Sequence, residues 1–137
     1  MYIIIAGCGR VGASLVNMLS GEGHDVVVID RDINSFSRLG SGSNCMTIPG
    51  IPIDEDVLKE AGIERADALA AVTADDNTNI MIAQIAQQLY QVPFVIMQTE
   101  DPEKQRALTA MGLRTVCSTT LTVESFFNAL KKGEPGR

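Results

Sequence analysis

Short apolar runs alternate with amphipathic stretches along the whole chain. The runs are rich in isoleucine, valine and alanine, and in the stretches apolar residues recur every three or four positions. The runs have the length of strands buried on both faces, and the stretches have the period of helices that pack on one side. Turn residues separate the two kinds of segment. We therefore predict six strands, at residues 2–6, 26–29, 45–48, 68–72, 93–97 and 115–117, with helices between them.

This alternation is typical of an α/β fold. We expect a Rossmann-like doubly wound parallel sheet of six strands in the order 3-2-1-4-5-6, and ligands bind beyond the carboxyl ends of such strands. The chain has 137 residues, which is enough for a single domain with a real core. We predict that this domain covers residues 1–130, that residues 121–130 form its last amphipathic helix, and that residues 131–137 are a flexible tail.

The first strand leads directly into the sequence GCGRVG at residues 7–12, and the second strand ends in Asp30. Strand, glycine turn, helix, strand and acid together make the dinucleotide-binding fingerprint. Gly7 permits a tight turn, Gly9 lets a pyrophosphate approach the backbone, and Gly12 lets the helix lie close to the strand. The alternative is that these are only the tight-turn glycines of an α/β unit, but one glycine would suffice for that.

Charged residues near this turn indicate which kind of dinucleotide is preferred. The carboxylate of Asp30 is suited to the ribose hydroxyls of an adenosine and would repel a 2′-phosphate, which favours NAD(H) over NADP(H). The neighbouring Arg31 works against this preference, since an arginine there can accommodate a 2′-phosphate. Arg10 is placed either to pair with the pyrophosphate or to lie in solvent.

Overall charge and cysteine content narrow the class of protein. The net charge of −6 argues against nucleic acid as a partner. Three cysteines without a CxxC pair indicate a reducing, cytoplasmic compartment. Cys8 lies inside the glycine turn, where it serves either packing or redox sensing. No apolar run is as long as a membrane span, and no metal-ligand cluster is evident.

Catalytic groups are not evident in the sequence. His24 is the only histidine and belongs to a turn at the opposite end of the sheet, and no nucleophile elbow or Walker lysine occurs. Asp75 and Asp76 are paired carboxylates at a helix start, where they either cap the helix or contact a ribose or a cation. A cofactor site without catalytic residues indicates a sensor. A small NAD-dependent oxidoreductase, or a fragment of one, is the alternative.

Four stretches resemble the TrkA/KTN family, also called the RCK N-domain, and the resemblance covers residues 1–130. They are YIIIAGCGRVG, VVVIDRD, LKEAGIERADALAAVT and DDNTNIMIAQIAQ. The resemblance implies a cytoplasmic regulatory subunit that binds NAD(H), or ATP, ADP or AMP in its place. It also implies homodimers or higher rings that gate a membrane potassium transporter or channel, through which the subunit is peripheral to the membrane.

The resemblance also implies site residues. The expected nucleotide contacts are Gly7, Gly9, Arg10, Val11, Gly12, Asp30, Arg31, Thr73, Asp75, Asp76 and Asn79. Two motifs depart from the family: Gly50-Ile51 replaces Gly-Asp after the third strand, and Thr119-Thr120 replaces Pro-Glu after the sixth, which puts a cation near the phosphates in doubt. The family's second, smaller domain is also missing, so the chain is a single-domain member or a fragment.

Aromatic residues in the last helix suggest how the chain associates. This helix carries more apolar side chains than the predicted sheet of one chain can cover, namely Phe126, Phe127 and Leu130. In the family that the chain resembles, this helix crosses to a neighbouring subunit. We therefore expect a homodimer with these three side chains against the partner.

Overall fold

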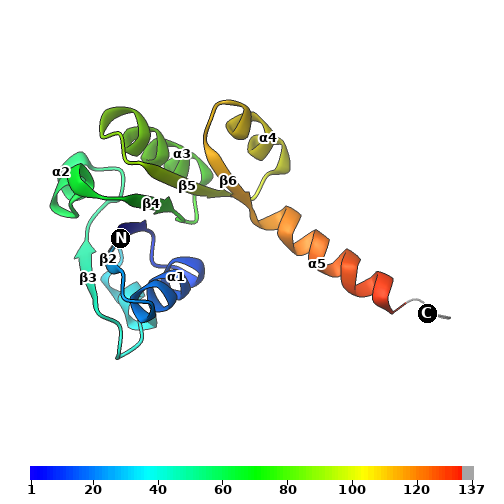
Figure 1. Ribbon diagram of the computed structural model, residues 1–137, viewed down its shortest axis with the longest axis horizontal. Coiled ribbons are helices and arrows are strands. Elements are labelled where there is room, and N and C mark those ends of the chain that lie inside the picture. Colours follow the sequence, from blue (N-terminus) through cyan, green and yellow to red (C-terminus); the bar gives the residue numbers. More distant parts are fainter. Residues whose placement is uncertain (134–137) are drawn as a thin grey trace.

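The computed structural model describes residues 1–133, and its centre is one six-stranded sheet (Figure 1). Every pairing is parallel and the strand order is β3-β2-β1-β4-β5-β6, which confirms the predicted doubly wound topology. The strands are β1 (Tyr2–Ala6), β2 (Asp25–Asp30), β3 (Cys45–Pro49), β4 (Ala68–Ala71), β5 (Phe94–Thr99) and β6 (Arg114–Cys117).

Helical segments connect the strands. The α-helices are α1 (Arg10–Gly21), α2 (Glu55–Glu60), α3 (Asp76–Gln84), α4 (Pro102–Ala110) and α5 (Ser118–Lys132). Three shorter segments are the 3₁₀-helices η1 (Ile33–Arg38) and η2 (Ile63–Arg65) and the π-helical continuation of α3, η3 (Ile85–Leu89). The last helix begins three residues earlier than predicted, directly after β6, and it includes Lys131 and Lys132 of the predicted tail. Residues 134–137 of that tail lie outside the described residues.

The two faces of the sheet are covered unequally. Alternate side chains of the strands, among them Ile4, Ile29 and Leu69, face a layer made by α2, α3 and α4. The other set, which includes Ile5 and Val28, faces only α1 and η1. Burial of this apolar area on both faces is the main source of stability for such a sheet.

The less covered face has an open groove beside α1. It has a volume of about 370 Å³ and runs across β1, β4, β5 and β6. Phe94 and Val116 in the outer strands remain 40% and 37% exposed there. The side of α1 that faces the groove contributes Val11, Leu15 and Leu19. This part of the sheet therefore presents an apolar surface that residues 1–133 leave uncovered.

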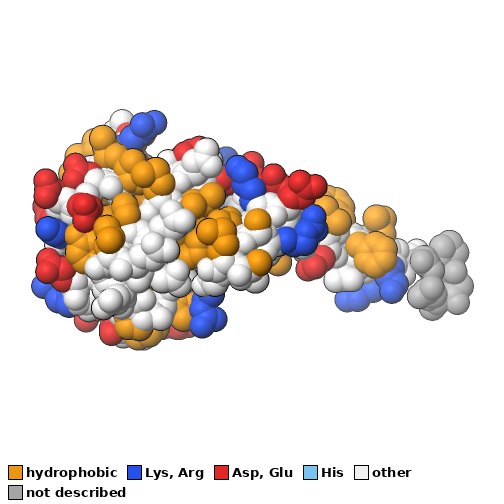
Figure 2. Space-filling view, turned by 90° about the horizontal axis from the view of Figure 1, so that it is seen from above, with side chains coloured by type: hydrophobic (Ala, Val, Ile, Leu, Met, Phe, Trp, Pro, Cys, Tyr) orange, Lys and Arg blue, Asp and Glu red, His pale blue; other side chains and the backbone are white. Residues whose placement is uncertain are grey.

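Helix α5 projects away from the sheet instead of folding back over it (Figure 1). None of its residues is buried. Val123, Phe126, Phe127 and Leu130 follow the i, i+3, i+4, i+7 spacing of one helix face, and Figure 2 shows apolar side chains along this projection. The two phenylalanines are about 100° apart around the helix and so flank a single apolar stripe.

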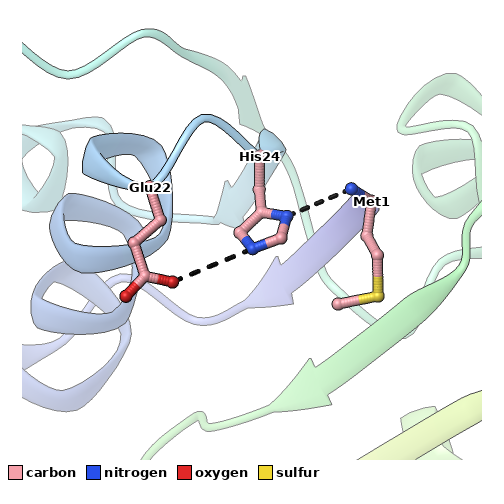
Figure 3. A network of polar contacts seen from close by, with 3 residues as sticks. All are labelled: Met1, Glu22 and His24. Atoms are coloured by element: carbon pink, nitrogen blue, oxygen red, sulfur yellow. Dashed lines mark hydrogen bonds and ion pairs between the residues drawn. The ribbon is translucent and has the colours of Figure 1, made fainter.

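The amino-terminal edge of the sheet carries a small polar network that contains the one histidine (Figure 3). The Nδ1 atom of His24 lies 3.1 Å from the amino group of Met1 and accepts its hydrogen bond, since an ammonium group can only donate. Its Nε2 atom lies 3.9 Å from a carboxylate oxygen of Glu22. His24 is thus half-buried and joins β1 to the turn before β2, at the end of the sheet opposite the glycine turn.

Among residues 1–133, no helix is long and apolar enough to cross a membrane.

Candidate functional site

A cavity of about 540 Å³ opens at the carboxyl ends of β1, β2, β3 and β4, where the strand order reverses. This is the position at which open α/β sheets bind ligands, and the volume is in the range of small-molecule pockets. The lining residues are Gly7, Gly9, Asp30, Arg31, Ile51, Pro52, Ile53, Val72, Thr73, Ala74, Asp75 and Thr78.

Three glycines shape the turn at this pocket, and two of them, Gly7 and Gly9, line it. Gly7 has φ +112°, and a Cβ there would lie 2.9 Å from the backbone nitrogen of Thr73. A Cβ at Gly12 would lie 1.9 Å from the carbonyl oxygen of Gly7, so α1 packs directly on the turn. Gly9 differs, because a Cβ there would meet no protein atom within 4 Å. The protein therefore needs Gly7 and Gly12 for its own packing, whereas Gly9 leaves space open in the pocket.

Asp30 is fixed beside this turn by two backbone donors. Its Oδ2 atom accepts from the backbone N–H of Cys8 at 2.8 Å, and its Oδ1 atom accepts from that of Asp32 at 2.8 Å. Each carboxylate oxygen has a further lone pair for a hydroxyl donor. The carboxylate is thus held at the end of β2, at the edge of the pocket, with an accepting lone pair left on each oxygen.

Cys8 is held inside the glycine turn with no exposed surface. Its Sγ atom lies 3.6 Å from the carbonyl oxygen of Ser35, to which it donates. Burial raises the pKa of the Cys8 thiol above its usual value, so the reactive thiolate is disfavoured. These surroundings favour packing over redox sensing for this side chain.

The start of α1 does not place all of the expected contacts in the pocket. Gly9 caps the helix without a side-chain hydrogen bond, and the first turn contains no acid. Its N–H groups and positive end are therefore free to meet an anion. Arg10 is exposed and is not among the lining residues, and Val11 faces the apolar groove instead. Gly12 is buried behind the turn.

The opposite wall of the pocket is held by Asn79, which is fully buried in α3. Its Oδ1 atom accepts from the backbone N–H and the hydroxyl of Thr73, at 2.9 and 2.7 Å. Its Nδ2 atom donates to the carbonyl oxygens of Thr73 and Gln98, at 3.1 and 3.0 Å. Asn79 therefore stands behind the wall and positions Thr73, which lines the pocket.

The paired carboxylates point in different directions. Asp75 lines the pocket and caps α3, accepting from the backbone N–H of Thr78 at 3.0 Å. Hydrogen bonds from the hydroxyl and the backbone of Thr78 hold the pKa of Asp75 below its usual value. Asp76 turns to the end of β5, where it accepts from the hydroxyl of the buried Thr99 at 2.6 Å. Asp75 thus faces the pocket, whereas Asp76 lies outside the pocket and connects α3 to the end of β5.

Sequence reasoning missed the apolar wall that follows β3. Ile51, Pro52 and Ile53 line the pocket next to Asp30, and Ile51 is 56% exposed. Their position after the third strand of a parallel sheet was a usable signal, because the carboxyl ends of such strands share one edge. This wall adds an apolar surface to the pocket beside the carboxylate of Asp30.

The fold and the pocket together define a Rossmann-type domain with a glycine turn at the switch point of its sheet. The chain matches the TrkA-N domain over residues 3–119, and it belongs to that family. It is 42% identical over 130 residues to the "Trk system potassium uptake protein TrkA" of Streptomyces coelicolor. That match covers 95% of this chain and 58% of the relative, so the chain spans little more than half of that protein.

Solved structures show the same fold. The GsuK RCK domain superimposes with a TM-score of 0.81 at 24% identity, covering 98% of this chain and 29% of that one. The GsuK channel bound to NAD matches with a TM-score of 0.70 at 22% identity, over 84% of this chain and 21% of the other. GsuK bound to ADP matches with a TM-score of 0.69 at 22% identity, over 85% and 31% of the two chains.

Proposed function

We propose that this chain is a non-catalytic regulatory unit that binds an adenine nucleotide and controls a membrane potassium transporter or channel. The nucleotide is NAD(H), with ATP, ADP or AMP as the alternatives. The observation that carries the proposal is the pocket in which the open start of α1, the fixed carboxylate of Asp30 and the apolar residues 51–53 lie in the order of pyrophosphate, ribose and base. The family and its relatives, among them a Trk system potassium uptake protein, support a role in potassium transport. The chain is proposed to act at the cytoplasmic face of the membrane, through its transport partner.

Gly9 offers a direct test of the binding site. A Cβ there meets no protein atom, so Gly9→Val should retain the fold while its side chain occupies the space of the pyrophosphate. Calorimetric titration with NAD should give binding by wild type and at least about tenfold weaker binding by Gly9→Val, equivalent to about 1.4 kcal/mol. Gly21→Val is the matched control, since a Cβ at Gly21 would also have no atom within 4 Å and this residue lies at the far end of α1. Equal affinities of wild type and Gly9→Val would remove the site assignment.

The functional class is tested separately from the site. A regulatory unit should bind NADH without oxidising it, whereas a small oxidoreductase would consume it when offered carbonyl substrates. Absorbance of NADH over time distinguishes the two. A potassium-uptake assay in cells that lack the chain, with wild type or Gly9→Val restored, then connects nucleotide binding to transport. Uptake that is equal with both proteins would contradict nucleotide control.

The chain is also proposed to act as a homodimer in which α5 of each copy covers the apolar groove of the other. The stripe of Val123, Phe126, Phe127 and Leu130 has no partner within the described chain, and the groove offers an apolar surface without a covering helix. Light scattering should give the dimer mass for wild type and a shift toward monomer for Phe127→Asp. Ser125→Asp adds the same charge on the opposite side of α5 and should remain dimeric. A monomeric wild type would refute this arrangement.

A further inference from the structure

Two helices begin at the pocket, and their first turns differ in charge. Helix α1 begins after Gly9 with no side-chain cap and no acid in its first turn. Helix α3 begins after Asp75, whose carboxylate already accepts the N–H of Thr78, and Asp76 follows in its first turn. The positive end of α1 is therefore open to an anion, whereas that of α3 is neutralised by its own acids.

The strand order fixes which part of a ligand meets each helix. Across the pocket lie, in sequence, residues 51–53 after β3, Asp30 at the end of β2, the glycine turn after β1, and residues 73–78 after β4. A nucleotide with its ribose at Asp30 and its first phosphates at α1 must extend its next group toward α3. For a nucleoside triphosphate that group is a terminal phosphate, and for a dinucleotide it is a second ribose.

We propose that Asp75 makes the pocket selective for a dinucleotide of the NAD type over a nucleoside triphosphate. Its carboxylate accepts hydrogen bonds from the hydroxyls of a second ribose and repels a terminal phosphate at the same place. This inference rests on the proposed nucleotide site and adds to it the residue that determines the ligand class. Asp75 is exposed and ionised at neutral pH like an ordinary aspartate, and the hydrogen bonds from Thr78 favour the same charged form.

The test compares three ligands and three proteins. NAD, ADP and ATP are titrated calorimetrically, in EDTA so that no cation masks the phosphates, into wild type, Asp75→Asn and Asp101→Asn. Asparagine is also a good helix cap, so Asp75→Asn removes the charge and keeps the start of α3. Asp101→Asn is the matched control, because Asp101 caps α4 by the same kind of bond to the N–H of Glu103 and does not line the pocket.

Wild type should bind NAD at least about tenfold tighter than ATP, and Asp75→Asn should reduce this ratio by about fivefold or more, as expected for one charge contact. ADP ends at the pyrophosphate and should bind both proteins alike, and Asp101→Asn should behave as wild type. A wild type that prefers ATP, or an Asp75→Asn protein with an unchanged NAD-to-ATP ratio, would overturn the inference. Absence of binding by all three ligands would instead refute the nucleotide site itself.

Discussion

The two walls of the pocket are built by opposite means. The wall after β1 is made of backbone, and its shape depends on the absence of side chains at Gly7 and Gly12. The wall after β4 depends on side chains, because the buried Asn79 bonds the backbone of Thr73 and Gln98, and the buried Thr99 donates to the carboxylate of Asp76. The first wall is therefore sensitive to an added atom and the second to a lost polar atom. Four substitutions or conditions test this difference.

The largest effect is expected for Gly12→Ala. The added Cβ would lie 1.9 Å from the carbonyl oxygen of Gly7, so α1 and the turn must separate. Overpacking of this kind costs about 3 kcal/mol of the free energy of unfolding, which urea denaturation measures. Gly21→Ala in the same helix meets no atom and serves as the control. Equal stability of both variants would contradict the close packing of this wall.

Asn79→Leu should have the next largest effect. Leucine has a similar size but leaves the N–H of Thr73 and the carbonyl oxygen of Gln98 without their partner. The expected loss is about 2–3 kcal/mol in the free energy of unfolding, because buried unpaired groups retain their desolvation cost. Asn77→Leu changes a more accessible residue of the same helix and should leave stability nearly unchanged. If the two variants were equally stable, the network would not be what supports this wall.

Thr99→Val tests the contribution of one hydrogen bond to the wall after β4. Valine keeps the shape of the side chain and removes the hydroxyl that donates to Asp76 at 2.6 Å. We expect a loss of about 1 kcal/mol in thermal or urea unfolding. Thr109→Val replaces an exposed threonine of α4 and provides the baseline. A loss no larger than this baseline would argue that Asp76 is satisfied by solvent.

The smallest effect is a pH dependence at Asp75. Its pKa is lower in the folded protein than in the unfolded chain, so its contribution to stability is present above the unfolded pKa of about 3.9 and is lost as the pH falls through the folded value. The difference in unfolding free energy between wild type and Asp75→Asn should therefore decrease below about pH 4. Chemical denaturation at several pH values measures it. A difference that grows on acidification would contradict the stated direction.

Much of the fold was predictable, because the central strands β1, β2 and β4 are apolar runs and helical stretches alternate with the strands. The glycine turn and Asp30 were also readable, since their spacing reflects backbone requirements. Side-chain directions were harder to predict. Val11 belongs to the fingerprint but faces the groove, and a motif does not specify which way a residue at the start of a helix points.

Asn79 was expected to contact the nucleotide, but the sequence also carried a signal for its buried place behind the wall. It stands at the start of the buried stripe of α3 and its π-helical continuation, followed by Ile82, Ala83 and Ala86 at helical spacing. A polar residue at a buried position must find partners inside the protein, so its place behind the wall follows from periodicity. The apolar wall at residues 51–53 was signalled only by its position after β3, because Ile51, Pro52 and Ile53 carry no polar ligand chemistry of their own.

The projecting helix α5 has a mechanical consequence. None of its described residues is buried, and at its base the Ser118 hydroxyl lies 3.5 Å from the carbonyl oxygen of Thr99. Leu130 is twelve residues further on, or about 18 Å along the helix at 1.5 Å per residue. A tilt of about 10° at Ser118 would thus carry Leu130 through about 3 Å. Thr99 also donates to Asp76 beside the pocket, so Ser118, Thr99 and Asp76 link the base of α5 to that wall by two hydrogen bonds.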